Sequence, residues 1–112
     1  MHSLHDPKRV LVVDDEVLIL RVVAALLDGL AVVRTAATAA DALTLLATEP
    51  FDVMLCDHHL GAEVTGSELL DDVAVRWPAV RRYLISASDI PTVHAVLRKP
   101  FDFDTLRGVV EG

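Results

Sequence analysis

Five short apolar segments recur along the 112-residue chain, and they alternate with segments in which apolar residues recur at helical spacing. Short continuous runs of aliphatic and β-branched residues are typical of strands buried on both faces of a parallel sheet. We expect these strands at residues 9–13, 31–36, 51–56, 80–86 and 94–98. The alternation of strands and helices predicts an α/β fold with a doubly wound parallel sheet.

The helical segments carry recognisable start and stop residues. We expect helices at residues 16–28, 38–49, 66–77 and 104–110. Gly29 follows the first helix where a helix stop belongs, Thr38 caps the second helix, and Pro50 ends it. Asp102 or Asp104 lies near the start of the last helix. Together these elements predict a three-layer, flavodoxin-like fold with five parallel strands in the order 2-1-3-4-5.

One connection is too short to carry a helix. Only residues 87–93 separate Ser86 from His94, whereas a crossover that includes a helix needs at least about ten to twelve residues. A regular fourth helix should therefore be absent or reduced to a turn, with Pro91 inside it. Seven extended residues span roughly 23 Å at about 3.3 Å each, so the chain can still return and the fifth strand can remain parallel.

The composition fits one small domain and argues against several functions. With 112 residues and 53% hydrophobic content the chain can form one core, so we expect a single domain over residues 1–112. The net charge of −7 argues against non-specific electrostatic binding of nucleic acid, and we expect no direct nucleic-acid contact by this domain. A lone cysteine, Cys56, fits a reducing compartment, and no apolar run approaches the roughly 18 residues of a membrane span. We therefore expect a cytoplasmic protein that makes no membrane contact.

Polar residues lie at the ends of four of the five predicted strands. Asp14 and Asp15 follow the first strand, Asp57 follows the third, Ser86 ends the fourth and Lys99 follows the fifth. In open α/β sheets, ligands bind beyond the carboxyl ends of the strands, at the point where the strand order reverses. Each residue alone could be an ordinary capping, turn or surface residue. Their conjunction at one edge of the sheet predicts a binding site.

The three aspartates predict a cation. Carboxylates held about 4 Å apart repel each other by something like 4 kcal/mol per pair at an effective dielectric of about 20. One or two carboxylates, with water and an incoming phosphate completing an octahedron, describe a Mg²⁺ site, at which Mn²⁺ could substitute. Zinc is disfavoured, because His58 and His59 have neither a cysteine partner nor helical spacing, and their side chains are weak candidates as ligands.

Four motifs, taken in order, match those of a known family. They are Val12-Val13-Asp14-Asp15-Glu16, Leu55-Cys56-Asp57-His58-His59-Leu60 with Gly66, Ile85-Ser86-Ala87 and Lys99-Pro100-Phe101. Together they resemble the receiver domains of bacterial two-component response regulators, and the resemblance covers nearly the whole chain. Each motif alone is weak, but their order and their positions at strand ends make the set specific.

The resemblance implies a phosphorylation switch. Asp57 would accept a phosphoryl group from a phosphohistidine on a sensor histidine kinase or a histidine phosphotransfer protein. Ser86 would donate its hydroxyl to that group, Lys99 would pair with it, and the Lys99–Pro100 bond would be cis. The domain would not be an enzyme in the usual sense, since it would catalyse only its own phosphorylation and dephosphorylation. The phosphorylated state would act on a downstream partner or on a fused output domain.

The resemblance also implies a ligand set for the metal. Asp15 and Asp57 would bind Mg²⁺ directly, Asp14 would bind it through water, and His59 would contribute its backbone carbonyl. A metal and a lysine together would offset the charge on the transferred phosphoryl group, because phosphoryl transfer depends mostly on positioning and charge neutralisation.

Two departures from the family pattern concern the switch and leave the chemical groups in place. Val96 occupies the position where the family usually has an aromatic residue, and the segment after Ser86 is too short for the usual fourth helix. A pseudo-receiver, which binds partners with little phosphorylation, is therefore the first alternative. A Mg-dependent phosphohydrolase is the second, although the chain has no cap domain or long insertion to enclose a substrate. A flavin-binding protein is the third, although Asp14 and Asp15 stand where a phosphate-binding loop is expected.

Overall fold

Five strands form one parallel sheet in the computed structural model, which describes residues 7–61, 64–88 and 92–112. The sheet order is β2-β1-β3-β4-β5, which confirms the predicted order. The strands are β1 (Lys8–Val13), β2 (Ala31–Ala36), β3 (Val53–Asp57), β4 (Arg81–Ser86) and β5 (Ala95–Arg98). The third strand begins two residues later than predicted, and the other strand ends agree to within one residue.

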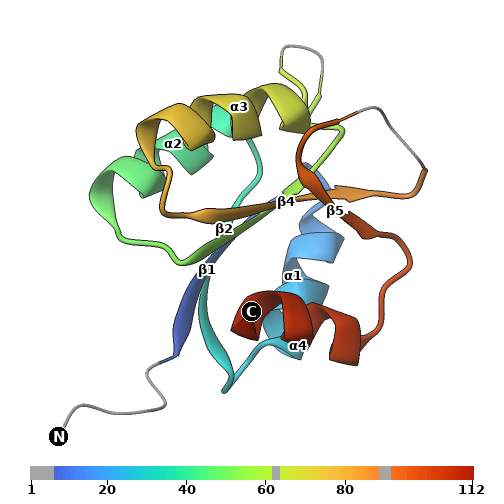
Figure 1. The fold of residues 1–112 in the computed structure, drawn as a ribbon. Helices are drawn as coiled ribbons and strands as arrows, with labels where there is room; N and C mark the ends of the chain where they lie inside the picture. Colours follow the sequence, from blue (N-terminus) through green and yellow to red (C-terminus); the bar gives the residue numbers. More distant parts are fainter. Residues whose placement is uncertain (1–6, 62–63, 89–91) are drawn as a thin grey trace, which may run out of the picture.

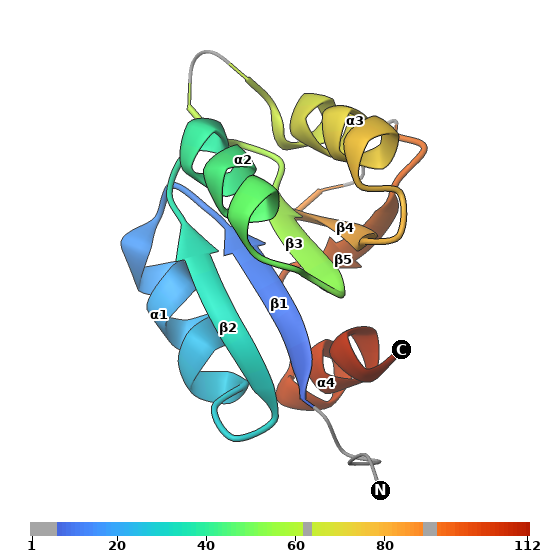
Figure 2. The same cartoon turned by 90° about the vertical axis from the view of Figure 1, so that its left-hand side faces the viewer.

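Two helices cover each face of the sheet, so the predicted three layers are confirmed. In Figure 1, α2 and α3 lie above the sheet and α1 and α4 lie below it, and Figure 2 shows the same layers from the side. The helices are α1 (Val17–Leu26), α2 (Ala39–Thr48), α3 (Gly66–Arg76) and α4 (Phe103–Glu111). Among the described residues, no helix combines the length and the apolar character that crossing a membrane requires.

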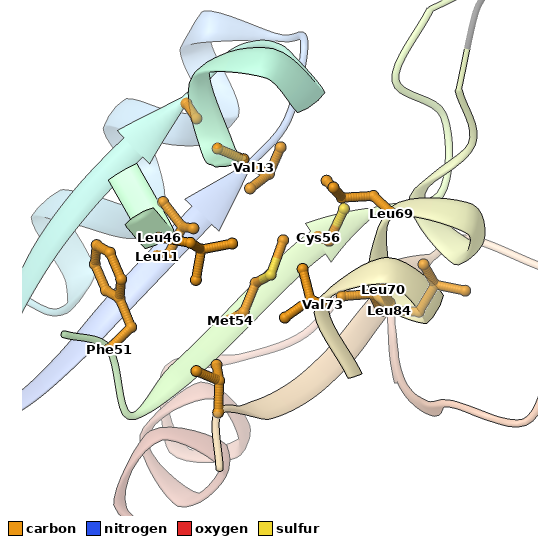
Figure 3. Close-up of a cluster of buried hydrophobic side chains, with 13 residues drawn as sticks. Leu11, Val13, Leu46, Phe51, Met54, Cys56, Leu69, Leu70, Val73 and Leu84 are labelled. Carbon is orange, nitrogen blue, oxygen red and sulfur yellow. The ribbon is translucent and has the colours of Figure 1, made fainter. Parts of the chain in front are cut away.

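The core consists of two apolar clusters, one on each face of the sheet. Figure 3 shows the cluster under α2 and α3, in which Leu11 and Met54 project from neighbouring strands. Their sequence neighbours Val12 and Leu55 belong to the cluster under α1 and α4. Successive side chains of a strand point to opposite faces, so a strand that supplies both clusters must be apolar throughout. This requirement explains the continuous apolar runs of β1 and β3.

The expected loss of a helix between β4 and β5 is borne out by the described residues. Those of residues 87–94 that the structure describes contain no helix, and β5 still pairs with β4 in parallel. Pro91, which we expected inside this connection, lies outside the described residues. The label α4 therefore belongs to the last helix of the chain, which Asp102 caps by accepting a hydrogen bond of 2.8 Å from the Thr105 N–H.

A capping box starts α3, directly after the loop that follows Asp57. The Thr65 hydroxyl accepts a 3.1 Å hydrogen bond from the Glu68 N–H, and the Glu68 carboxylate accepts one of 3.0 Å from the Thr65 N–H. We expect Thr65→Ala to lower the free energy of unfolding by about 1 kcal/mol, because one helix-end N–H loses its acceptor. Urea denaturation would measure the loss, with Thr65→Ser as the control that keeps a hydroxyl. Equal unfolding midpoints for the alanine variant and the wild type would contradict the capping role.

Candidate functional site

The sheet register brings the ends of β1, β3 and β4 to one edge. Val13 pairs with Cys56, so Asp14 leaves β1 beside Asp57, the last residue of β3. Ser86 is the last residue of β4, and Lys99 directly follows β5. Because all five strands are parallel, these residues lie at the carboxyl edge of the sheet, where open α/β folds place their ligands.

Three carboxylates meet at this edge. One oxygen from each of Asp14, Asp15 and Asp57 lies within 4.8 Å of the others. Asp14 is completely buried and Asp57 is 5% exposed, whereas Asp15 is exposed to solvent. The group therefore has two buried members and one open to water. The imidazoles of His58 and His59 are not members of the group.

Asp14 is a buried carboxylate with an unused oxygen. Its Oδ1 accepts a 2.9 Å hydrogen bond from the Glu16 N–H, but its buried Oδ2 has no hydrogen-bond partner. Burial raises the pKa of Asp14, the Glu16 N–H lowers it, and repulsion from Asp57 raises it further. A buried acceptor without a partner is costly, so the site fits a cation that would bind near this oxygen.

Lys99 partly neutralises the carboxylates. Its Nζ lies 3.1 Å from Asp57 Oδ1 and 3.9 Å from Asp14 Oδ2. Three carboxylates and one ammonium leave two negative charges without compensation. A divalent cation with a preference for oxygen ligands matches this donor set. The Lys99–Pro100 bond that follows is cis, as the resemblance implied.

The hydroxyl of Ser86 is bound within its own turn. Its Oγ donates a 2.8 Å hydrogen bond to the Ser88 carbonyl and accepts one of 3.2 Å from the Ser88 N–H. Ser86 is 5% exposed and directly follows Ile85, the residue of β4 that pairs with Asp57. To donate to a group on Asp57, the hydroxyl must give up the bond that it donates to the Ser88 carbonyl, whereas the bond from the Ser88 N–H uses only its oxygen.

Gly66 fixes the backbone of the predicted acceptor, a role that the sequence did not reveal. Its N–H donates a 2.8 Å hydrogen bond to the His58 carbonyl, and a Cβ at Gly66 would overlap the backbone carbonyl oxygen of Asp57. The His58 N–H in turn donates to the Ile85 carbonyl at 3.0 Å. The start of α3 and β4 therefore hold the end of β3 from both sides. The sequence offered two signals for this residue, its place in the motif after Asp57 and a glycine at the start of a predicted helix, where a close backbone approach is one reason for a glycine.

His59 lies on the surface of the loop after β3. It forms an isolated antiparallel bridge with Thr65, and its ring packs edge-on against His58 with centroids 4.8 Å apart. The structure therefore does not bring its side chain into the carboxylate group. This arrangement is compatible with the expected role, which involves only the backbone carbonyl of His59.

Comparison with known sequences identifies relatives over most of the chain. The sequence model of the family described as response regulator receiver domain matches residues 10–111. The hydrogenase transcriptional regulatory protein HoxA of Cupriavidus necator is 40% identical over 77 residues, which are 69% of this chain. The transcriptional regulatory protein ZraR of Escherichia coli is 32% identical over 117 residues, covering 96% of this chain. The chain spans 16% and 26% of the lengths of these two relatives.

Comparison with solved structures finds the same fold. The chemotaxis protein CheY4 of Vibrio cholerae is 25% identical, with a TM-score of 0.84 over 95% of this chain and 98% of that one. A CheY-like receiver domain protein of Methanospirillum hungatei is also 25% identical, with a TM-score of 0.86 over 95% of this chain and 92% of that one. NtrX of Brucella abortus is 31% identical, with a TM-score of 0.84, and the match covers 95% of this chain and 26% of NtrX.

Proposed function

The chain belongs to the family of response regulator receiver domains, which are phosphoacceptor signalling domains, and we propose that its phosphoacceptor is Asp57. The observation that carries this proposal is the setting of one carboxylate. Asp57 is nearly buried at the carboxyl edge of the sheet, lies within the group of three carboxylates and contacts Lys99 at 3.1 Å. Cys56, the neighbouring thiol, is no rival nucleophile, because burial raises its pKa and keeps it protonated.

In the proposed reaction, a carboxylate oxygen of Asp57 attacks the phosphorus of a phosphohistidine. A phosphorus–oxygen bond forms, the phosphorus–nitrogen bond breaks, and the released imidazole takes a proton. The ammonium of Lys99 is positioned to balance charge on the transferred group, since it already lies between Asp57 and Asp14. Ser86 would exchange the hydrogen bond that it donates to the Ser88 carbonyl for one donated to a phosphoryl oxygen. The site thus positions and neutralises the group without a conventional substrate pocket.

We further propose that Mg²⁺ binds at the carboxylate group. Asp15 and Asp57 would hold it directly, Asp14 would hold it through water, and the His59 carbonyl would complete the protein ligands. The support is the unpartnered Oδ2 of Asp14 and the two negative charges that Lys99 leaves uncompensated. When bound, the ion would neutralise charge on the incoming phosphoryl group.

The remaining proposals concern the setting of the domain. Residues 1–112 would act as one receiver domain that catalyses only its own phosphorylation and dephosphorylation, in the cytoplasm. Its donor would be a sensor histidine kinase or a histidine phosphotransfer protein. The net charge of −7 supports a role without direct nucleic-acid contact for this domain. Its output would lie in a downstream partner or in a fused domain.

Phosphoramidate tests the function directly, because its phosphorus–nitrogen bond resembles that of phosphohistidine. We expect incubation with phosphoramidate and Mg²⁺ to attach one phosphoryl group to the protein. Neutral hydroxylamine should then remove it, because an acyl phosphate on a carboxylate reacts with hydroxylamine and a phosphate ester on serine does not. A label that survives hydroxylamine, or no label at all, would contradict an aspartyl phosphate.

The metal proposal predicts a large effect of Asp15. We expect Asp15→Ala to weaken Mg²⁺ binding at least about tenfold, because the change removes the solvent-accessible carboxylate of the group. Isothermal titration with MgCl₂ would measure the affinity. Asp28→Ala is the matched control, since it removes an exposed carboxylate in the turn after α1. Equal affinities for wild type and Asp15→Ala would exclude Asp15 as a ligand.

A further inference from the structure

β5, the strand that leads to Lys99, has little packing around it. It is four residues long, lies at the edge of the sheet and is buried only at Leu97. Among the described elements, only β4 lies extensively alongside it. The described residues of the connection before it supply no covering helix. β5 is therefore held mainly by its ladder with β4 and by Leu97, which belongs to the same apolar cluster as Leu106 and Val110 of α4.

Among the described residues, a side-chain contact ties the residue before β5 to α3. The Nε2 of His94, the residue just before β5, lies 2.7 Å from Oδ1 of Asp71, which is 23 positions earlier in α3. A carboxylate only accepts hydrogen bonds, so the ring nitrogen donates. The His94 side chain is only 8% exposed although that of Asp71 is 64% exposed. The imidazole is therefore largely shielded from solvent, and its contact with Asp71 orients the ring.

The same helix also holds the acceptor strand. Gly66, the first residue of α3, donates to the His58 carbonyl and abuts the carbonyl of Asp57. Five residues further along the helix, the Asp71 carboxylate contacts His94. α3 is thus a common support for the strand that ends in Asp57 and for the strand that leads to Lys99.

We propose that His94 is a positioning residue for phosphoryl transfer: by tying β5 to α3 it sets the place of the Lys99 ammonium relative to Asp57. This inference rests on the proposed function of Asp57. The contact to be maintained is the 3.1 Å distance between Lys99 Nζ and Asp57 Oδ1. The competing support is β4, because the Lys99 N–H also donates to the Ser86 carbonyl at 2.8 Å.

A set of variants separates the effect of the His94–Asp71 contact from effects on the general stability of α3. His94→Ala and Asp71→Ala remove the two halves of the contact, and His94→Gln keeps a side-chain N–H donor. Asp72→Ala is the matched control, because it removes the next residue of the same helix and breaks the exposed Asp72–Arg76 ion pair. Circular dichroism would establish that each variant is folded. Asp71 is exposed, so its variant provides the test even where His94→Ala does not fold.

Two measurements test the proposal on the full chain. The NMR signal of the Lys99 ammonium, recorded without any phosphoryl donor, should shift in His94→Ala and Asp71→Ala and stay unchanged in Asp72→Ala. Uptake from acetyl phosphate with Mg²⁺ should slow at least about tenfold in the first two variants, since a displacement of ~1 Å can cost about 100-fold. In His94→Gln, the NMR signal of Lys99 and the rate of uptake should both return most of the way to their wild-type values. If His94 acts through Lys99, His94→Ala should have no further effect on the residual uptake of Lys99→Met.

Different failures have different meanings. An unchanged Lys99 signal in the folded variants would overturn the proposal, because the lysine would then be positioned without His94. Equal slowing by His94→Ala with and without Lys99 would also overturn it. If the lysine signal shifts as expected but the wild type takes up no phosphoryl group, the proposed function of Asp57 fails. The influence of the His94–Asp71 contact on the position of Lys99 would still be established.

Discussion

Asp57→Asn should abolish phosphoryl uptake and leave the domain folded. The asparagine amide keeps the shape of the side chain but lacks the carboxylate oxygen that would attack phosphorus. The fold should survive, because the change removes one of three carboxylates that lie within 4.8 Å of one another. Each such pair repels by about 3 kcal/mol at an effective dielectric of ~20, which offsets the lost attraction between Asp57 and Lys99.

The measurement for this variant is uptake from acetyl phosphate, followed by circular dichroism of the same sample. Asp52→Asn is the matched control, because Asp52 precedes the opposite end of β3, where its carboxylate accepts a 2.8 Å hydrogen bond from the Arg9 N–H. It should take up the phosphoryl group at the rate of the wild type. Labelling retained in Asp57→Asn would place the acceptor on another residue.

Gly66→Ala should damage both stability and uptake. An alanine Cβ would overlap the backbone carbonyl oxygen of Asp57, and neither backbone can yield without moving the end of β3 or the start of α3. We expect a loss of about 1–3 kcal/mol in the free energy of unfolding, as for an overpacked core. Uptake should fall by up to about 100-fold, because the displaced group is the acceptor itself.

Gly108→Ala should have the opposite effect on stability to Gly66→Ala. Gly108 lies within α4, and beyond its chain neighbours and the nearby backbone of the helix itself, a Cβ there would meet no described atom within 4 Å. Replacing an unobstructed helical glycine by alanine should stabilise the domain by up to about 1 kcal/mol. Urea denaturation of the two variants would compare the effects. A Gly66→Ala variant as stable and as active as the wild type would contradict the close approach of Gly66 to Asp57.

The fold could be predicted from the sequence because each element is encoded locally. The run at residues 9–13 is apolar at nearly every position, which indicates a strand buried on both faces, and Gly29 lies where the structure has a positive φ of 80° after α1. The missing helix followed from the length of one connection. None of these arguments needed a contact between distant residues, so the strand order and the layers followed from topology alone.

The site could be predicted only as a set of residues at one edge. The sequence placed Asp14 and Asp15 together, but their different burial depends on how the chain turns after β1. The sequence predicted that the Ser86 hydroxyl donates to the phosphoryl group. It did not predict the two hydrogen bonds that this hydroxyl makes with Ser88 in the structure. Such contacts depend on side-chain geometry, which periodicity does not report.

The contact between His94 and Asp71 was outside the reach of sequence reasoning for a different reason. Neither residue belongs to a motif, and they are 23 positions apart in elements that meet only in the folded sheet. We interpreted His94 as part of a strand, and Asp71 lay on a predicted helix without a distinguishing feature. Only the folded arrangement of α3 and the start of β5 brings them within hydrogen-bond distance.

The most direct test of the central claim, that Asp57 accepts a phosphoryl group in a metal-dependent reaction, is the intact mass of the wild type after incubation with acetyl phosphate. The protein would be incubated in parallel with MgCl₂ and with EDTA. We predict a gain of one phosphoryl group with MgCl₂, located on Asp57 by fragmentation, and little or none with EDTA. An unchanged mass in both samples would contradict the phosphoacceptor assignment and favour a pseudo-receiver that signals through its fold alone.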